Sequence, residues 1–432
     1  MNLLMIGLIG LAVMVILILL KVQVGIAMGI VGFLGFAYIA GWPAALGLLK
    51  TVPYATIANY SLSVVILFVF MGQFLSESGM SNDLFDCAQK WIGAVPGGLA
   101  MATVVSCTGV GALCGSTTAT TATMGIVALP AMKRHNYDSG FAAATVACAS
   151  TVSTMIPPSV LLILYGVTTT QSIGKLFQAA IIPALILAVF FCVMIYFRIK
   201  LNPAIGPKGV KYTWKERFTA LWKIKDVVLV IVLVIGGIMV GVFTVNEAGA
   251  VGVLGVVVAS LFRKKLTFKT VRNALLNTGK TIAMIFFIIL NAMILGYFFS
   301  ITQMPQQIAI ILNGLAVSKY VILACIVVIF LFLGAIMDEL AMLLVTVPIF
   351  YPVVIGLGFD PLWFGVMIVI LMASGQICPP VGMNCFIIAG IDKSIPLAKV
   401  YSGILPYWIC LIIMMVLITV FPQICLFIPG LG

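Results

Sequence analysis

A run of hydroxyl side chains interrupts an apolar part of the sequence. Residues 111–125 read GALCGSTTATTATMG. The hydroxyl groups within this stretch belong to Ser116, Thr117, Thr118, Thr120, Thr121 and Thr123. Hydroxyl oxygens can ligate a hard cation, and hydroxyl groups can donate hydrogen bonds to the oxygen atoms of a substrate. A threonine in a helix can instead bond the carbonyl four residues back, which we expect for Thr121 and Thr123. That explanation fits Ser116 and Thr117 less well, because they follow a glycine at a turn.

A second polar point in the chain carries two carboxylates. Asp338 and Glu339 lie between the apolar runs 320–337 and 340–357, neither of which contains a basic residue. A carboxylate at the centre of a bilayer costs roughly 2.5–3.5 kcal/mol, so residues of this kind are candidates for function. If Asp338 is buried, we expect it to ligate sodium or to accept hydrogen bonds from substrate hydroxyls, with Glu339 the less important of the two. The alternative is that both residues form a wet, solvent-facing turn of a complete hairpin.

The composition predicts a membrane protein with many spans. Of 432 residues, 63% are hydrophobic and 8% are charged, and the mean hydropathy is +1.28, whereas a soluble chain carries roughly 25% charged residues. Apolar stretches of about 18 residues or more can cross a bilayer as helices, which satisfy their own backbone groups. The predicted spans cover residues 3–20, 24–41, 56–79, 140–165, 175–198, 226–243, 248–262, 277–300, 360–388 and 396–421. The first of these is interpreted as a span and not as a signal peptide.

The positive charges indicate the orientation of the chain. The net charge is +12, and lysines and arginines cluster at Lys21 and in the segments 133–134, 198–225 and 263–272. Short basic loops are typical of the cytoplasmic side of a membrane and do not indicate nucleic-acid binding. Ten crossings then place both termini on the outer side. The segment 201–225 mixes aromatic and basic residues and forms either a helix on the cytoplasmic surface or a solvated loop.

The chain offers few groups for metal or enzyme chemistry. Its ten cysteines include no CxxC pair, and His135 is the single histidine. Zinc sites, disulfide frameworks and organic cofactors are therefore not expected. An aspartyl intramembrane protease needs two intramembrane aspartates, and a zinc protease needs the HExxH spacing. The sequence meets neither requirement, so we do not expect an enzyme.

Two further apolar regions, 97–132 and 320–357, each consist of two apolar runs that meet at a polar point. Each region forms either a full transmembrane hairpin or a re-entrant hairpin that turns back midway. The polar point of the first region, 115–118, contains glycine and hydroxyl groups but no charge. Irregular backbone at membrane depth is tolerated only where protein or a cavity covers it, which favours a buried tip for this hairpin.

The two halves of the sequence resemble each other. Each contains a Pro-Pro pair, an apolar run that ends at a glycine, a polar bend with Ser-Ile, and a proline before another apolar span. The separation between Pro157 and Pro379 is the same as that between Ser172 and Ser394. Upstream, the suspected hairpin tips open at matched glycines. The sequence therefore contains an internal repeat.

We predict two repeats, 1–225 and 226–432, that cross the membrane in opposite directions. Tandem prolines break the spans 140–165 and 360–388 and leave free backbone groups at mid-depth. Interrupted helices at matched positions of inverted repeats are typical of a midplane substrate and ion site in a secondary transporter. The alternative is that each Pro-Pro pair only kinks an ordinary helix. A channel is a further alternative, although such breaks suit alternating access better than a continuous pore.

The chain resembles the large membrane subunit of tripartite ATP-independent periplasmic (TRAP) transporters in the segments GSTTATTATMGIVALPAM, IPPSVLLILYGV, SIGKLFQAAIIP, MDELAMLLVTVPIFYPVV and CPPVGMNCFII. The resemblance implies an all-α polytopic membrane protein, an inverted-repeat elevator-type transporter with two re-entrant helical hairpins and two Pro-Pro-broken spans. It places the chain in the bacterial inner membrane, with both termini periplasmic.

The same resemblance implies a function and partners. The function is sodium-coupled uptake of a small organic acid anion, a carboxylate or sulfonate such as the sialic acid or C4-dicarboxylate class, with Na⁺ as the coupling ion. The partners are a small four-span membrane subunit (Q type) and a periplasmic substrate-binding protein (P type). The alternative is an ion-coupled carrier of the same broad fold that works without a binding protein.

The resemblance also implies site residues. One sodium site is expected at Gly115, Ser116, Ser150 and Ser153. A second is expected at Gly334, Asp338, Gly375 and Cys378, largely through backbone carbonyls. Substrate is expected between the hairpin tips, near Thr117, Ser159 and Asp338. The chain departs from the family pattern in carrying threonines at the first tip, and Ser150 and Ser153 where glycines are common, which leaves the substrate open.

Overall fold

The computed structural model of the chain describes residues 2–207, 209–314 and 317–431. Within these ranges the chain forms helices and no strand, which confirms the predicted all-α fold. In this part of the chain, six helices are long and apolar enough to cross a membrane. They are Tyr60–Glu77, Ile173–Leu201, Val245–Phe262, Phe268–Thr302, Glu339–Gly356 and Leu397–Val420. The chain is therefore a multi-pass membrane protein, as its composition predicts.

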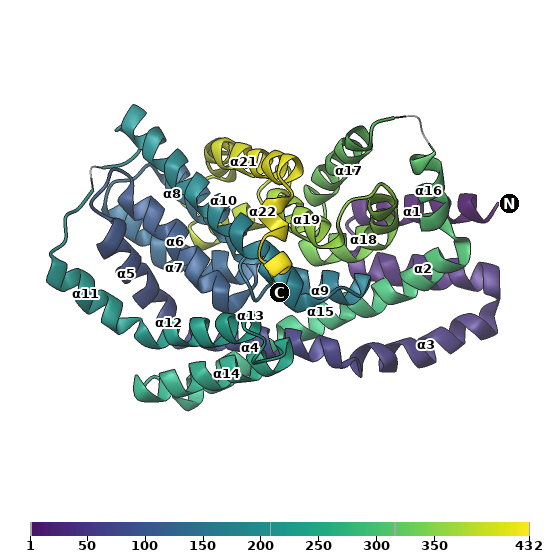
Figure 1. The fold of residues 1–432 in the computed structure, drawn as a ribbon, viewed down its shortest axis with the longest axis horizontal. Coiled ribbons are helices and arrows are strands. Elements are labelled where there is room, and N and C mark those ends of the chain that lie inside the picture. The colour runs from purple at the N-terminus through teal and green to yellow at the C-terminus, as the bar shows by residue number, and fades with distance from the viewer. Residues whose placement is uncertain (1, 208, 315–316, 432) are drawn as a thin grey trace.

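Short connections join the helices (Figure 1). The first half contains α1 Leu3–Leu19, α2 Val24–Ala40, α3 Trp42–Ile57, η1 Tyr60–Leu62, α4 Ser63–Glu77, α5 Met80–Ile92, α6 Gly98–Cys114, α7 Thr117–Arg134, α8 Ser139–Ala149, η2 Ser150–Thr154, α9 Val160–Thr169 and α10 Ile173–Leu201. The remaining elements are α11 Trp214–Lys223, α12 Lys225–Ile231, η3 Val232–Gly236, α13 Gly237–Met239, α14 Val245–Phe262, α15 Phe268–Thr302, α16 Met304–Asn313, α17 Lys319–Gly334, α18 Glu339–Gly356, α19 Pro361–Gly375, α20 Met383–Ile391, α21 Leu397–Val420, α22 Gln423–Leu426 and η4 Pro429–Leu431.

The order of elements recurs along the chain. The series from α4 to α10 and the series from α15 to α21 each contain a long helix, a short helix, a helical hairpin, a broken helix and a final long helix. Helices α7 and α18 have 18 residues each. Their first residues, Thr117 and Glu339, are separated by the same stretch of chain as the two Pro-Pro pairs. The sequence repeat therefore has a structural counterpart, which covers residues 60–201 and 268–420 of the two predicted halves.

Both Pro-Pro segments interrupt their helices. Helix α8 tightens into the 3₁₀ turn η2, which ends at Thr154, and α9 begins only at Val160. Helix α19 ends at Gly375, and α20 begins at Met383. Prolines lack the backbone N–H that would continue each helix, so the chain crosses both gaps in irregular conformation. The pairs therefore do more than kink two continuous helices.

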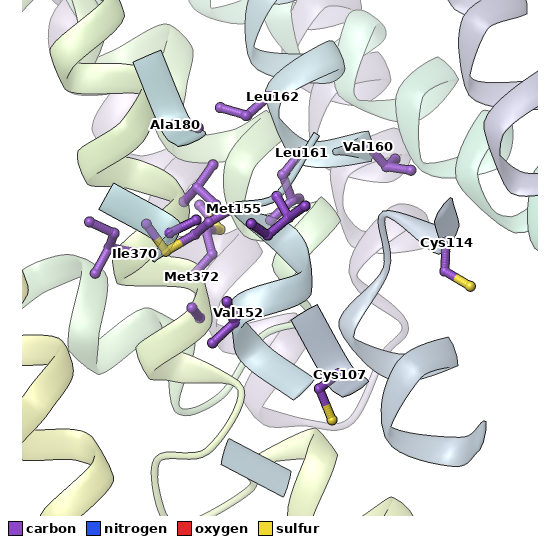
Figure 2. Close-up of a cluster of buried hydrophobic side chains, with 14 of the residues drawn as sticks. Cys107, Cys114, Val152, Met155, Val160, Leu161, Leu162, Ala180, Ile370 and Met372 are labelled. Carbon is purple, nitrogen blue, oxygen red and sulfur yellow. The ribbon is translucent and has the colours of Figure 1, made fainter. Parts of the chain in front are cut away.

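The two broken helices meet in the core. Met155, in the first gap, lies among Ile370 and Met372 of α19, and all three side chains are buried (Figure 2). In the same view Cys114, at the end of α6, lies apart from this group. Packing of the first break on the helix that leads into the second fixes the two broken helices relative to each other.

Helix α15 connects the hairpin regions to the N-terminal helices. It has 35 residues and packs against α2, α4 and α18. Its contact with α2 is close, because a Cβ added to Gly32 would lie 2.6 Å from the backbone nitrogen of Leu295. The two helices run side by side in Figure 1. Helices α4 and α15 thus form a wall beside the hairpins.

The structure differs from the predicted spans in the stretch 56–79. Helix α3 ends at Ile57, and the next span begins with η1 and α4 at Tyr60. The following helix, α5, was not predicted, since it is amphipathic and includes Asp83 and Asp86 among its polar residues. A second difference is that the predicted span 226–243 consists of α12, the π-helical turn η3 and α13.

The segment 201–225 is part helix and part loop. Helix α11 covers only Trp214–Lys223, and a capping box between Thr213 and Glu216 starts it. Trp214 packs edge-on against Trp91 of α5, with ring centroids 6.5 Å apart, while remaining 65% exposed. The prediction of a helix is therefore correct for these ten residues, and the alternative of a loop is correct for 202–207 and 209–213. The position of the helix on the cytoplasmic surface stays a prediction.

Ion pairs join the loops on the side of the basic clusters. Lys133, at the end of α7, pairs with Asp392 after α20, and Lys399 of α21 pairs with Asp138 before α8 at 3.1 Å. The Lys133 ammonium and then the Ser394 hydroxyl hold the pKa of Asp392 below its ordinary value. These pairs connect the first hairpin to the end of the second broken helix, and the start of the first broken helix to α21.

Candidate functional site

The first hairpin turns at a glycine that no other residue can replace without strain. Gly115 has φ +60°, and a Cβ there would lie 2.2 Å from the carbonyl oxygen of Pro158. Ser116 then caps α7, because its Oγ accepts the amide of Ala119 at 3.5 Å. The tip of the first hairpin therefore packs directly on the break of the first broken helix.

The second hairpin turns at the matched position with an acidic cap. Asp338 caps α18, and its Oδ2 accepts the amide of Leu340 at 3.1 Å. Asp338 is half-buried, and Glu339, the first residue of the helix, is only 6% exposed. Glu339 is therefore not solvent-facing, whereas Asp338 borders a cavity, and the depth of this tip in the membrane stays a prediction. Glu339 is also more deeply buried than Asp338, although the sequence analysis ranks it second.

The two hairpin tips touch. The Thr117 hydroxyl donates to Glu339 at 3.0 Å from Oε1 and 3.1 Å from Oε2. Both residues open the second helix of their hairpin. The contact therefore joins equivalent positions of the two repeats through one neutral and one acidic side chain.

A cavity of about 310 Å³ lies beside this contact. It is formed by both hairpin tips, the start of α9 and the inner faces of α4 and α15. Its walls consist of Val69, Gly72, Gln73, Cys114, Gly115, Ser116, Thr118, Ala119, Val160, Leu161, Thr281, Met284, Ile285, Asp338, Glu339 and Leu340. These walls include two carboxylates but no lysine, arginine or histidine.

A second cavity of about 450 Å³ adjoins the first. The two share Gly72, Gln73, Cys114 and Ala119 as wall residues. The second cavity extends along α7 to the end of α4, where Glu77 accepts hydrogen bonds from Asn273 and Asn277 of α15. Since α15 follows the basic segment 263–272, this end faces the side that the positive charges assign to the cytoplasm.

The residues predicted for substrate contact do not all reach the cavity. Asp338 is one of its wall residues. Thr117 and Ser159 are fully buried and lie one residue before Thr118 and Val160, which do line it. Gln73 and Thr118 are wall residues that the sequence patterns did not indicate, and the weaker role expected for Glu339 stays a prediction. The sequence does indicate Glu339 as a candidate, because it is a charged residue directly beside Asp338 in an apolar run.

The residues predicted for the first sodium site are only partly together. Gly115 and Ser116 form the tip, whereas Ser150 and Ser153 lie beside α6, at least one turn before the tip. A Cβ on Gly111 would lie 2.5 Å from Ser153 Cα. The Ser150 hydroxyl donates to Val146 O at 2.8 Å, and that of Ser153 donates to Ser150 O at 2.6 Å. Both hydroxyls therefore donate to backbone carbonyls of their own segment, and lone pairs on their oxygens can still ligate a cation.

The residues predicted for the second sodium site are closer to one another. The backbones of Gly334 and Gly375 meet, since a Cβ on Gly375 would lie 2.7 Å from Gly334 Cα. Cys378 follows at the end of the same turn and is half-buried, and Asp338 is four residues beyond Gly334. This glycine pair lets helix α17 lie directly against the second break.

The second break also contains polar atoms that the sequence analysis did not single out. Gln376 Oε1 and Asn384 Oδ1 are buried and have no hydrogen-bond partner among the described residues. The Asn384 amide group donates to Ala147 O of α8 at 3.1 Å, so it bridges the two broken helices. Uncharged oxygens of this kind are suitable ligands for a hard cation.

One expectation for the threonine run was wrong. Neither Thr121 nor Thr123 bonds the carbonyl four residues back. Thr123 Oγ1 lies 3.0 Å from Ser76 Oγ of α4, and Thr121 Oγ1 has no partner in the described part of the chain. Side chains from a neighbouring helix were available for Thr123, which sequence spacing within one helix cannot reveal.

Comparison with known proteins agrees with this architecture. Residues 11–424 match the family model described as the DctM component of the tripartite ATP-independent periplasmic transporters. The chain is 33% identical over 380 residues to the C4-dicarboxylate TRAP transporter large permease protein DctM of Pseudomonas aeruginosa, covering 87% of this chain and 88% of that protein. It is 32% identical over 418 residues to the isethionate TRAP transporter permease protein DctMQ of Oleidesulfovibrio alaskensis, covering 95% and 65%. The fold is also similar to that of the YdaH transporter of Alcanivorax borkumensis, with a TM-score of 0.61, 15% identity and coverage of 88% and 89%.

Proposed function

The chain belongs to the DctM component family of the tripartite ATP-independent periplasmic transporters, and on this premise we propose that it carries out sodium-driven uptake of a small organic acid. The relatives are transport permeases and not enzymes. Their printed substrates differ, a C4-dicarboxylate in one and isethionate in the other. The proposed substrate class is therefore a small carboxylate or sulfonate.

The main support for this proposal is the cavity between the hairpin tips. It combines residues of both repeats, and the tips that enclose it touch through Thr117 and Glu339. Its volume of about 310 Å³ lies at the lower end of the range of about 300–1,000 Å³ that small-molecule sites occupy. A site at which two matched repeats meet is the place from which a substrate can be released to either side by moving one part against the other.

The charges around this cavity support the proposal of sodium coupling. An anion placed there meets Asp338 and Glu339 and no basic wall residue. Helix N-termini supply only about half a positive charge each. Bound sodium ions supply the missing charge, with oxygen ligands available at the Gly334–Gly375 contact and at Gln376. The first predicted site, at Ser116 and the serines of η2, supplies hydroxyl oxygens for another ion.

The recurring elements support an elevator movement. In this proposal the halves 1–225 and 226–432 are inverted repeats, and both hairpins are re-entrant. The hairpins and the broken helices move together as one body, because the tips contact each other and the first tip contacts its break. Helices α4 and α15 form the wall past which that body moves.

The proposed partners are a small four-span membrane subunit and a periplasmic binding protein. The family's tripartite organisation supports both. The isethionate relative, of which the chain spans about two thirds, is a longer permease protein whose name joins M and Q. The proposed location is the bacterial inner membrane, with both termini periplasmic.

Reconstitution tests this function directly. The chain is placed in liposomes alone, with the small subunit, and with both partners, and uptake of a radiolabelled organic acid is measured. Sodium-dependent uptake by the complete system only is expected. Robust uptake by the lone chain would support a carrier that needs no binding protein. Uptake that persists with potassium in place of sodium and follows only pH would contradict sodium coupling.

A further inference from the structure

The wall of the cavity between the hairpin tips has two chemically different parts, which are named for their helices as the α7–α9 end and the α18 end. At one end lie the first turns of α7 and α9, with Ser116, Thr118, Val160 and Leu161 in the wall. At the other end lies the first turn of α18, with Asp338 and Glu339. The Thr117–Glu339 hydrogen bond of 3.0 Å holds these ends next to each other. One small molecule therefore reaches both.

The end formed by α7 and α9 suits an acid group. The first amides of a helix have no partner within the helix, and the helix dipole makes this end partly positive. Neither α7 nor α9 has an acidic residue in its first turn. The hydroxyls of Ser116 and Thr118 add further donors, 3.1 Å from each other. A carboxylate or sulfonate oxygen fits this end.

The end formed by α18 suits a positive group. Glu339 is only 6% exposed, and its single donor is the neutral hydroxyl of Thr117. No lysine, arginine or histidine of the described chain forms an ion pair with Asp338 or Glu339. A buried carboxylate without a countercharge is costly, and a cationic ligand removes that cost.

An organic anion that carries no positive group makes no favourable charge contact with the α18 end. Its own charge would be repelled by two carboxylates, and its hydroxyl groups would bring no countercharge. The two sodium ions of the proposed function balance the two carboxylates, and the charge of the anion itself is then left without a partner. A substrate that brings its own positive group matches both ends of the cavity.

We infer that the substrate of this chain is a small zwitterion, an organic acid that also carries an ammonium or related cationic group. The acid group binds at the starts of α7 and α9, and the cationic group binds Glu339 and Asp338. This inference rests on the proposed function, since it concerns the same transport site. It makes Glu339 the residue that sets the substrate class.

Matched probe pairs test the inference. Taurine and isethionate differ by an ammonium in place of a hydroxyl group, and aspartate differs from succinate by an added ammonium. Thermal stabilisation of the purified membrane complex by each probe is measured in sodium. The wild type is expected to be stabilised more by the ammonium-bearing member of at least one pair. Glu339→Gln is expected to reduce that preference by about tenfold or more, because a buried charge pair is lost. Glu247→Gln, which changes an exposed carboxylate at the start of α14, serves as the control and keeps the preference.

Three results would overturn the inference. They are tighter binding of isethionate and succinate, no stabilisation by taurine or aspartate, and an unchanged preference in Glu339→Gln. Sodium-driven uptake of only the plain anions would overturn the inference while leaving the proposed function intact. An ammonium preference in binding without any uptake by the complete system would contradict the proposed function alone.

Discussion

Helices α7 and α18 begin at matched positions of the two repeats, with different chemistry at their starts. Ser116 and Thr117 open the first, and Asp338 and Glu339 open the second. Serine and aspartate are about equally good helix caps, and each accepts an amide of its own helix. Both pairs therefore cap their helices equally well, whereas the net charge of the two pairs differs by two units.

This difference shows which features belong to the fold and which belong to the site. The cap and the start of each helix recur because the hairpin needs them, whereas the turn glycine Gly115 has Met337 at its matched position. The two carboxylates occur once, at the tip that faces the cavity with no basic partner in its wall. The breaks also share their packing and differ in a side chain. Ser153 and Gly375 occupy matched positions of the repeat, and each packs against a glycine of its hairpin.

Exchanging the two caps is expected to have the largest effect. The double variant Ser116→Asp, Asp338→Ser keeps a capping side chain on both helices, so assembly and melting temperature should change little. Moving the charge to the end that suits an acid group should reduce sodium-driven uptake by about a hundredfold or more. Asp338→Asn, which keeps the shape and removes the charge, should also lose most uptake. Normal uptake by the exchanged protein would show that the position of the charge has no importance.

Filling the glycine contact of the second hairpin is expected to have an intermediate effect. In Gly375→Ala the new Cβ would lie 2.7–3.0 Å from backbone atoms of Gly334, so α17 must move away at a cost of about 1–3 kcal/mol. A lower melting temperature and weaker uptake are expected. Gly390→Ala is the matched control, because open space surrounds that position. Equal melting temperatures for the two variants would contradict the close approach of α17 and α19.

Loss of the ion pairs between the loops is expected to have the smallest effect. Lys133→Ala removes the partner of Asp392, whose side chain is 19% exposed, and pairs near the surface contribute about 0–1 kcal/mol. The pKa of Asp392 is lowered from 3.8, so its contribution is complete above that value and is lost as the pH falls through the lowered pKa. The variant should therefore show the same small loss of stability at pH 5 and pH 8. A loss that grows between these values would contradict this assignment.

Sequence patterns predicted the breaks and the hairpins better than they predicted which side chains line the cavity. Proline pairs at a constant spacing and a glycine at the first tip have local causes, so the breaks, the hairpins and the tip at Gly115 were predictable. The contact between Thr117 and Glu339 depends on how two hairpins meet in space, and no local pattern contains that information. Helix α5 is amphipathic, so a pattern of apolar spans does not predict it. Gln73 lines the cavity only because α4 packs beside the tips.

The central claim is that the two tips act as one site, and a double-mutant cycle tests it most directly. Initial rates of sodium-driven uptake are compared for the wild type, Thr117→Val, Glu339→Gln and the double variant in the complete reconstituted system. Because both single changes remove the same hydrogen bond, the double variant should lose less than the sum of the single losses, by about 0.5–3 kcal/mol. Losses that simply add would show that the two tips act independently and would contradict the account.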